Sequence, residues 1–179
     1  YAWGEYDVWG YHLVNFAAHF LAVVCVFLLG RALGKTAWGA VLGAAIFALH
    51  PLQTEAVNYI SSRSESLAAL FYLGGLLSYV HGRNKGRDGQ IFFFLTALAF
   101  VAGLLCKSIV ITMPAALLLG EWVWGQARGQ KEIWKAVRRY HLLYWGIALA
   151  YLIYHWSTAP GLQTTLDRPV RALDAQMFT

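Results

Sequence analysis

Long apolar runs constrain the fold of this chain more than any other feature of its sequence. Six such runs lie near residues 11–33, 36–50, 66–81, 91–106, 108–124 and 140–156. About 20 consecutive apolar residues span a bilayer as a helix, and flanking aromatic and small residues bring the shorter runs close to that length. Hydrophobic residues make up 59% of the chain and charged residues 13%, which is more apolar than one soluble core requires. The sequence therefore predicts an all-α, polytopic membrane protein with about six transmembrane helices.

The fourth and fifth runs form one continuous apolar stretch that a polar pair interrupts. The stretch from Ile91 to Trp124 is too long for a single crossing, and Lys107 and Ser108 lie near its middle. We expect a hairpin of two helices that turns at this pair. Because proline removes a helix hydrogen bond, Pro114 is expected to kink the second helix.

The basic residues are divided unequally between the two sides of this predicted topology. One side receives ten of the 14 lysines and arginines, and the other keeps Arg63, Lys107, Arg168 and Arg171. The side that is rich in basic residues is expected to face the cytoplasm. The net charge of +5 is then explained by orientation in the membrane, and we expect no nucleic acid as a partner.

The polar segment HPLQTEAVNYISSRSES, residues 50–66, faces outward in this topology. Pro51 suits a first helical turn, so a short surface helix is expected near residues 51–60. Ser62 and Glu65 have the spacing of a capping box for the helix that follows. Arg63 would lie at the first turn of that helix, where unpaired backbone N–H groups help to hold an anion.

Two further polar features lie on the outer side. Lys107 either extends to the membrane interface or joins Arg63 around a phosphate or pyrophosphate group. His12, Asn15 and His19 form a stripe at helical spacing on the first span, and polar groups there should face the interior of the bundle. Each histidine is either a core residue bonded to a neighbouring helix or part of a site. A metal site is not expected, since no carboxylates stand at ligand spacing.

Three segments of the chain resemble successive motifs of one enzyme family. They are WGYHLVNFAAH, HPLQTEAVNYISSRSESLAALFYL and LLCKSIVITMPAALLL. They look like motifs of the transmembrane and tetratricopeptide-repeat O-mannosyltransferases and their bacterial relatives. The likeness runs from Trp9 to about Leu119, and the H-P-x-x-T-E-A-V block is its most specific part.

This resemblance implies a glycosyltransferase of the GT-C type. Such an enzyme transfers a sugar, mannose or a similar hexose, from a polyprenyl-phosphate or dolichyl-phosphate donor to a protein hydroxyl. Transfer takes place on the periplasmic side of a bacterial inner membrane or the lumenal side of the endoplasmic reticulum. The implied partners are membrane lipid, the lipid-linked donor and a protein acceptor. No cofactor is certain, and nothing in the sequence supports a divalent metal.

The resemblance also implies roles for single residues. Arg63 and Lys107 would bind the donor phosphate. The sugar or the acceptor would be lined by His50, Glu55, Asn58, His12, Asn15 and His19. The main catalytic acid is expected upstream of Tyr1, with Glu55 as the fallback candidate. The chain departs from the family in having Ser108 where many eukaryotic members carry an acid. A first span and a downstream tetratricopeptide-repeat domain are expected of the family and are absent from this sequence.

A second class of function stays open from the residues alone. A non-catalytic membrane scaffold or a transporter could use the same outer polar segment to bind a lipid headgroup. Apart from the histidine stripe, no ionisable residue suggests a proton relay, and no paired broken helices are evident.

The topology makes a prediction that can be checked by labelling. Single cysteines that replace Thr54 and Gln163 should react with an impermeant thiol reagent added from outside, whereas a cysteine that replaces Asn84 should not. Equal labelling of the Thr54 and Asn84 variants from outside would contradict the six-span topology.

Overall fold

The computed structural model of the chain describes residues 8–51, 63–85, 89–125, 134 and 137–158. These described residues form helices and no strand, which confirms the all-α class. The α-helices are α1 (Val8–Ala32), α2 (Ala37–Leu49), α4 (Arg63–Lys85), α5 (Gln90–Cys106), α6 (Met113–Gly125) and α8 (Leu142–Thr158). A 3-10 turn, η3 (Ser108–Thr112), precedes α6, and a π-turn, η4 (Val137–His141), precedes α8. The surface helix expected near residues 51–60 lies almost wholly outside the described residues.

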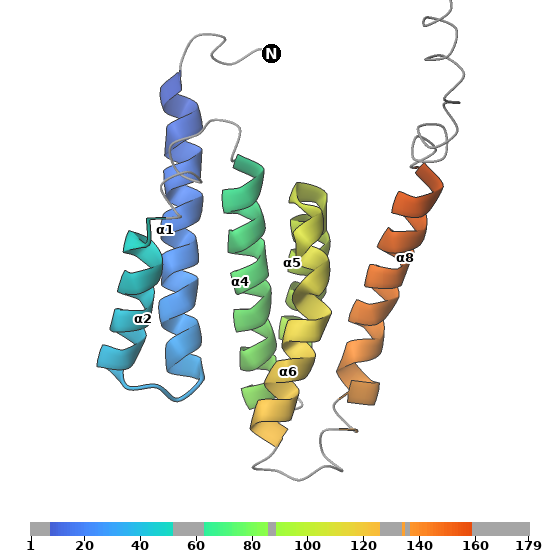
Figure 1. Ribbon diagram of the computed structural model, residues 1–179. Coiled ribbons are helices and arrows are strands. Elements are labelled where there is room, and N and C mark those ends of the chain that lie inside the picture. Colours follow the sequence, from blue (N-terminus) through green and yellow to red (C-terminus); the bar gives the residue numbers. More distant parts are fainter. Residues whose placement is uncertain (1–7, 52–62, 86–88, 126–133, 135–136, 159–179) are drawn as a thin grey trace, which may run out of the picture. The chain divides into compact units, whose positions relative to one another are not determined.

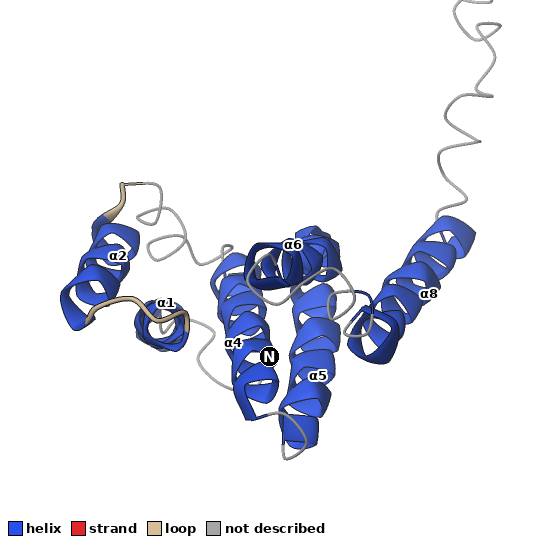
Figure 2. Cartoon of the chain, turned by 90° about the horizontal axis from the view of Figure 1, so that it is seen from below, coloured by secondary structure: helices blue, strands red, loops and turns tan. Residues whose placement is uncertain are grey.

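Successive helices of the first unit, Tyr1–Tyr144, run in alternating directions. In Figure 1, α1, α4 and α6 descend, whereas α2 and α5 ascend. The start of α1, the end of α2, the start of α4 and the end of α5 therefore lie at the same end. Seen along the bundle in Figure 2, α4 lies between α1 and α5, and α6 lies beside both α4 and α5.

Helices α1 and α2 pack through small side chains and expose many of their large ones. Buried positions on α1 and α2 include Ala18, Ala22, Ala40 and Ala44. Large exposed side chains follow a stripe along the outside of α1, namely Trp9, Leu13, Phe16 and Phe20. Small residues let helix backbones approach closely without a water-driven core, which is typical of helices packed in lipid.

The contact between α4 and α5 shows how close this approach is. Gly75 and Gly103 are buried, and the Thr96 hydroxyl donates to the Phe92 carbonyl at 2.8 Å and lies 3.3 Å from the Gly75 carbonyl. A Cβ atom on Gly103 would lie only 2.8 Å from Cγ1 of Val110, the buried residue of η3. Glycine is therefore required at this point for η3 to fold back on α5 and α4.

A tight turn joins α1 and α2. Gly34 adopts a positive φ of 76°, which glycine accepts without steric cost. Thr36 caps α2, since its hydroxyl accepts the Gly39 N–H at 3.1 Å. Beside the turn, Gly30 of α1 packs against Ala40 of α2, where an added Cβ on the glycine would lie 3.1 Å from the alanine Cβ.

The structure confirms the predicted hairpin at Lys107 and Ser108. α5 ends at Cys106, Lys107 is extended, and η3 leads into α6. The expected kink at Pro114 is wrong, because Pro114 is the second residue of α6. At the first turn of a helix its missing N–H has no intrahelical partner to lose, so it starts α6 instead of bending it.

Only part of the six-span prediction is confirmed. Among the described helices, α1 is the one that is both long and apolar enough to cross a membrane, by length and composition. α2 and α5 are shorter apolar helices, as is the segment Ser108–Val123. The helical architecture is therefore established, whereas the six-span arrangement stays a prediction.

The second unit, Trp145–Thr179, is described through α8 as far as Thr158. Tyr151 and His155 stack one turn apart in this helix, with ring centroids 6.0 Å apart. Its surface carries large apolar side chains, among them Leu149, Ile153 and Trp156.

The packing of Gly103 yields a stability prediction. Gly103→Ala should destabilise the bundle by about 1–3 kcal/mol, because the new methyl group overlaps Val110 in a well-packed contact. Gly74→Ala is the matched control, since a Cβ there meets nothing within 4 Å. Thermal unfolding in detergent measures both variants, and a Gly103→Ala variant as stable as Gly74→Ala would contradict the packing.

Candidate functional site

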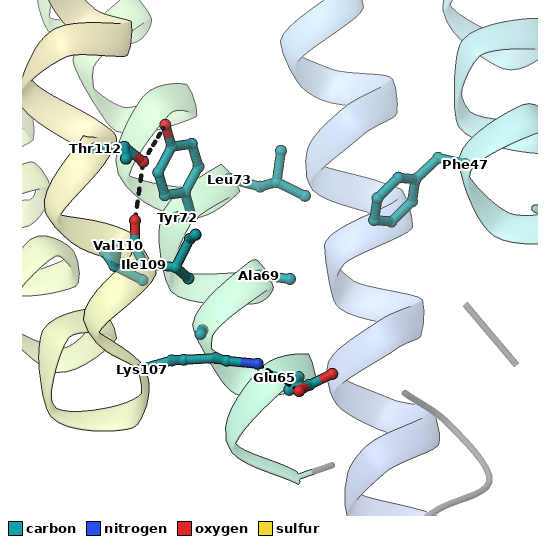
Figure 3. A pocket seen from close by; sticks show the side chains of 10 residues that line it. Phe47, Glu65, Ala69, Tyr72, Leu73, Lys107, Ile109, Val110 and Thr112 are labelled. Carbon is teal, nitrogen blue, oxygen red and sulfur yellow. Dashed lines mark hydrogen bonds and ion pairs between the residues drawn. The ribbon is translucent and has the colours of Figure 1, made fainter. Parts of the chain in front are cut away.

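A pocket of about 370 Å³ lies between α2, α4 and the turn that joins α5 to α6 (Figure 3). Most of its wall is apolar, and two charged side chains stand at one end. The lining residues are Phe47, Glu65, Ala68, Ala69, Tyr72, Leu73, Lys107, Ile109, Val110 and Thr112. An apolar cavity with a few polar groups at one end is the usual form of a small-molecule site.

The backbone at the end of α5 places Lys107 at this pocket. Its N–H donates to the Gly103 carbonyl at 2.9 Å and so closes α5, while its own φ of −157° and ψ of 134° are extended. The chain leaves the helix at this residue. The Val110 N–H then donates to the Lys107 carbonyl at 3.2 Å, which starts η3 and fixes the turn.

The ammonium group of Lys107 forms an ion pair with the Glu65 carboxylate. The two side chains are 43% and 46% exposed, so the pair is accessible from outside the pocket. An exposed pair of this kind contributes about 0–1 kcal/mol to stability and can exchange partners. Glu65 thus engages Lys107, and Ser62, its expected capping partner, lies outside the described residues.

Arg63 occupies the first position of α4, as expected, and has a different partner. Its guanidinium carbon lies 4.8 Å from the centroid of the Tyr11 ring, a cation–π contact between the starts of α4 and α1. Arg63 and Lys107 therefore lie at the same end of the bundle, each with its own partner. Their expected joint contact with one anion stays a prediction.

Two hydroxyl groups supply further polarity beside the pocket (Figure 3). Thr112 Oγ1 lies 2.9 Å from the Ile109 carbonyl and 3.4 Å from the Tyr72 hydroxyl. Since a threonine hydroxyl has one hydrogen, it donates to the carbonyl and accepts from Tyr72. The Tyr72 ring is thereby held against η3.

The polar stripe of α1 is only partly directed into the bundle. Asn15 is fully buried, as expected, whereas His12 and His19 are half-buried. His19 stacks on Phe47 of α2, with centroids 5.6 Å apart, and its Nε2 lies 3.4 Å from the Ala48 carbonyl. Phe47 also lines the pocket, so His19 supports one wall of it from behind.

The remaining predicted site residues are less defined by the structure. His50 is exposed and extended, and it directly follows Leu49, the last residue of α2. Glu55 and Asn58 lie outside the described residues, so the structure does not place them. Within the described ranges, no group of three or more His, Cys, Asp or Glu side chains could hold a metal ion.

The structure also contains a buried polar network that the sequence reasoning missed. Glu121 of α6 is 1% exposed and binds Arg83 of α4 through both carboxylate oxygens, at 2.5 and 2.9 Å. The Tyr79 hydroxyl donates to the same carboxylate at 2.7 Å and lies 2.8 Å from Nε2 of His141, which is fully buried. This network lies at the opposite end of α4 from the pocket.

A signal for this network was present in the sequence. Glu121 is an acid inside the apolar run 108–124, and a buried charge requires a partner. Arg83 is one of the ten basic residues that the sequence explains by membrane orientation alone. Burial alone would lower the pKa of the Arg83 guanidinium, but the hydrogen bonds and charge of Glu121 outweigh burial and raise the pKa. The arginine therefore stays charged in the network.

Comparison with known proteins finds relatives that all carry the name protein O-mannosyl-transferase. The chain is 35% identical over 113 residues to protein O-mannosyl-transferase Tmtc2 of Drosophila melanogaster, a match that covers 61% of this chain. It is 39% identical over 111 residues to Tmtc1 of the same organism, covering 62% of this chain. Human protein O-mannosyl-transferase TMTC3 is 34% identical over 116 residues, covering 63%.

The match spans 12% of the length of each of these relatives. No family model and no solved structure matches the chain. Over the matched part, this chain is therefore similar to the protein O-mannosyl-transferases Tmtc1, Tmtc2 and TMTC3.

Proposed function

We propose that this chain is part of a membrane glycosyltransferase that transfers a hexose, mannose or a similar sugar, from a polyprenyl-phosphate donor to a protein hydroxyl. The relatives are named protein O-mannosyl-transferases, which supports transfer to a protein. The observation that carries the donor assignment is the apolar pocket with Lys107 at its end. The pocket would take the first isoprenoid units of the donor lipid, and the lysine would face its phosphate.

The pocket walls suit a hydrocarbon chain. Ala68, Ala69 and Leu73 of α4 form one side, and Ile109 and Val110 of η3 form the other. A volume of about 370 Å³ is within the usual range for ligand sites and is enough for a short stretch of lipid. Alanines at two successive positions keep the wall close to the helix backbone and leave this space open.

The charges at the pocket suit a phosphate. Glu65 forms an ion pair with Lys107, and a phosphate group would compete with this carboxylate for the ammonium. Arg63, on the first turn of the same helix, would add a second cation once it turns from Tyr11. The departing phosphate needs such positive groups, because negative charge develops on it during transfer.

The proposed reaction also needs a base. A carboxylate must remove the proton of the acceptor hydroxyl while the bond from sugar carbon to phosphate oxygen breaks. Glu65 is already engaged with Lys107, which makes it a poor base. We propose that the main acid comes from the part of the protein upstream of Tyr1 and that Glu55 is the fallback. His50, Asn58, His12, Asn15 and His19 would line the sugar or the acceptor.

The membrane setting of this proposal is supported by the surface of the helices. Large apolar side chains such as Phe16, Leu42 and Ile46 are exposed, at 59%, 61% and 66%. Contiguous apolar surface of this kind is unfavourable in water and favourable against lipid. We propose that all six apolar runs are embedded, with the pocket on the periplasmic or lumenal side and the basic loops in the cytoplasm.

The alternative is a membrane scaffold or transporter that binds a lipid headgroup and does no chemistry. One observation favours it: the carboxylate that lines the pocket is neutralised by Lys107 instead of being free to act as a base. The two functions predict the same lipid binding and differ only in sugar transfer.

The charged pair predicts opposite effects for two substitutions. In the full-length protein, Lys107→Gln should weaken binding of polyprenyl phosphate by about tenfold or more, because a charge-assisted contact is lost. Glu65→Gln should strengthen binding, since it frees Lys107 from its competitor. Binding to protein in lipid nanodiscs measures both effects.

Arg63 offers a related test with its own control. Arg63→Gln should weaken donor binding, and Arg63→Lys should weaken it as well, because the planar two-point contact with phosphate is lost. Lys35→Gln, at the opposite end of the bundle, is the control and should leave binding unchanged. Unchanged donor affinity in both Arg63→Gln and Lys107→Gln would assign the two residues to interface anchoring.

Transfer itself gives a separate prediction. The purified 179-residue chain should bind polyprenyl phosphate without transferring sugar, because loss of a general base typically costs about 10²–10⁴ in rate. The full-length protein should transfer sugar under the same conditions. Activity of the short chain that is abolished by Glu55→Gln would make Glu55 the base, whereas a full-length protein that binds donor without transfer would favour the scaffold.

A further inference from the structure

The buried network at the far end of α4 has no role in the proposed transfer reaction. It joins Tyr79 and Arg83 of α4 to Glu121 of α6 and to His141, the last residue of η4. The pocket residues of α4 lie in its first half, between Glu65 and Leu73, whereas Tyr79 and Arg83 lie towards its end. The network therefore requires an explanation of its own.

The hydrogen bonds determine where the protons lie. Arg83 donates to both oxygens of Glu121, at 2.5 and 2.9 Å, so the carboxylate is ionised. An ionised carboxylate only accepts, so the Tyr79 hydroxyl donates its one hydrogen to Glu121. Nε2 of His141 lies 2.8 Å from the same hydroxyl and must supply the hydrogen of that second contact. The imidazole therefore carries a hydrogen on Nε2.

The other ring nitrogen of His141 is buried without a visible partner. Nδ1 has no hydrogen-bond partner among the described residues. The titratable or charged groups that surround the ring are Tyr79 and Arg83 of α4, Glu121 of α6, Tyr140 of the same turn and Tyr144 of α8. α5 contributes Phe93, which does not titrate and stacks on Tyr140 with centroids 4.0 Å apart. Among the described residues around the ring Glu121 is the one acid, and Arg83 already neutralises it.

We propose that Tyr79, Arg83, Glu121 and His141 form an acid-sensitive latch that holds the turn 137–141 against α4 and α6. His141 is its proton-binding group. With His141 neutral, the network has no net charge and each of its contacts has a donor and an acceptor. A proton on Nδ1 would add a second buried cation near Arg83 and an N–H that finds no acceptor among the described groups, which is costly.

The latch should therefore weaken on acidification. The unfolded chain takes up a proton on this histidine at about pH 6.5, whereas the closed latch resists it. The stabilisation that the latch gives to the folded chain is therefore complete above about pH 6.5. The free energy of unfolding falls as the pH decreases below that value. Carboxylates with ordinary pKa values near 4 do not titrate in this range. This inference does not depend on the proposed transferase function.

The first test is thermal unfolding of the chain in detergent micelles between pH 8 and pH 5.5. The midpoint of the wild-type chain should fall by roughly 2–4 °C over this range. His141→Gln should be insensitive to pH, because its amide still donates to the Tyr79 oxygen and does not titrate. His155→Gln, an exposed histidine in α8, is the matched control and should retain the wild-type dependence. Equal pH dependence of the wild-type chain and His141→Gln would overturn the proposal.

Two measurements keep the test decisive if His141→Gln does not fold. Nuclear magnetic resonance of the histidine rings at pH 8 should show the hydrogen of His141 on Nε2, and a hydrogen on Nδ1 alone would overturn the assignment. A nitroxide on a cysteine that replaces Arg138, an exposed residue of the turn, should become more mobile between pH 8 and pH 5.5. Mobility that does not change with pH would show that the turn is not held by a titrating group.

Discussion

Close contact between α4 and its neighbours is the constraint on which the rest of this structure depends. Ala68 and Gly75 face other helices where larger side chains would hold them apart, and Gly103 does the same from α5. Dispersion contacts and the Thr96 hydroxyl stabilise this packing without a large apolar core. Small residues occupy the closest contacts, many large apolar side chains face outward, and the helices acquire a surface suited to lipid.

This packing places charged groups at both ends of α4, with different physical consequences. The pair of Lys107 and Glu65 is half-exposed, so breaking it costs little and the lysine is available to a ligand. The pair of Arg83 and Glu121 is largely buried, and removing one partner would leave an uncompensated charge, at a cost of about 3–5 kcal/mol. At the start of α4, Lys107 can therefore exchange Glu65 for a ligand. At the end of α4, the pair of Arg83 and Glu121 holds α4 and α6 together.

The sequence predicted correctly that the chain is helical and where α5 turns towards α6. It predicted less well which side chains contact one another. The polar pair at Lys107 correctly placed the turn between α5 and η3, because a charge within an apolar run marks the end of a span. Pro114 was misread as a kink, since its position relative to the start of α6 depends on where η3 ends. Glu121 was overlooked because its partners lie 38 and 42 residues away in the chain.

Apolar periodicity and the polar interruption are local properties, and by themselves they determined that the chain is helical and where the α5–α6 hairpin turns. They also placed Arg63 at the start of α4 and buried Asn15 on α1. Only the tertiary structure decided that Glu65, and not a second cation, stands beside Lys107, and that Tyr79 joins an acid to a histidine. Those contacts depend on the rotation and register of packed helices. Close packing of side chains between helices sets both, and no local sequence pattern encodes them.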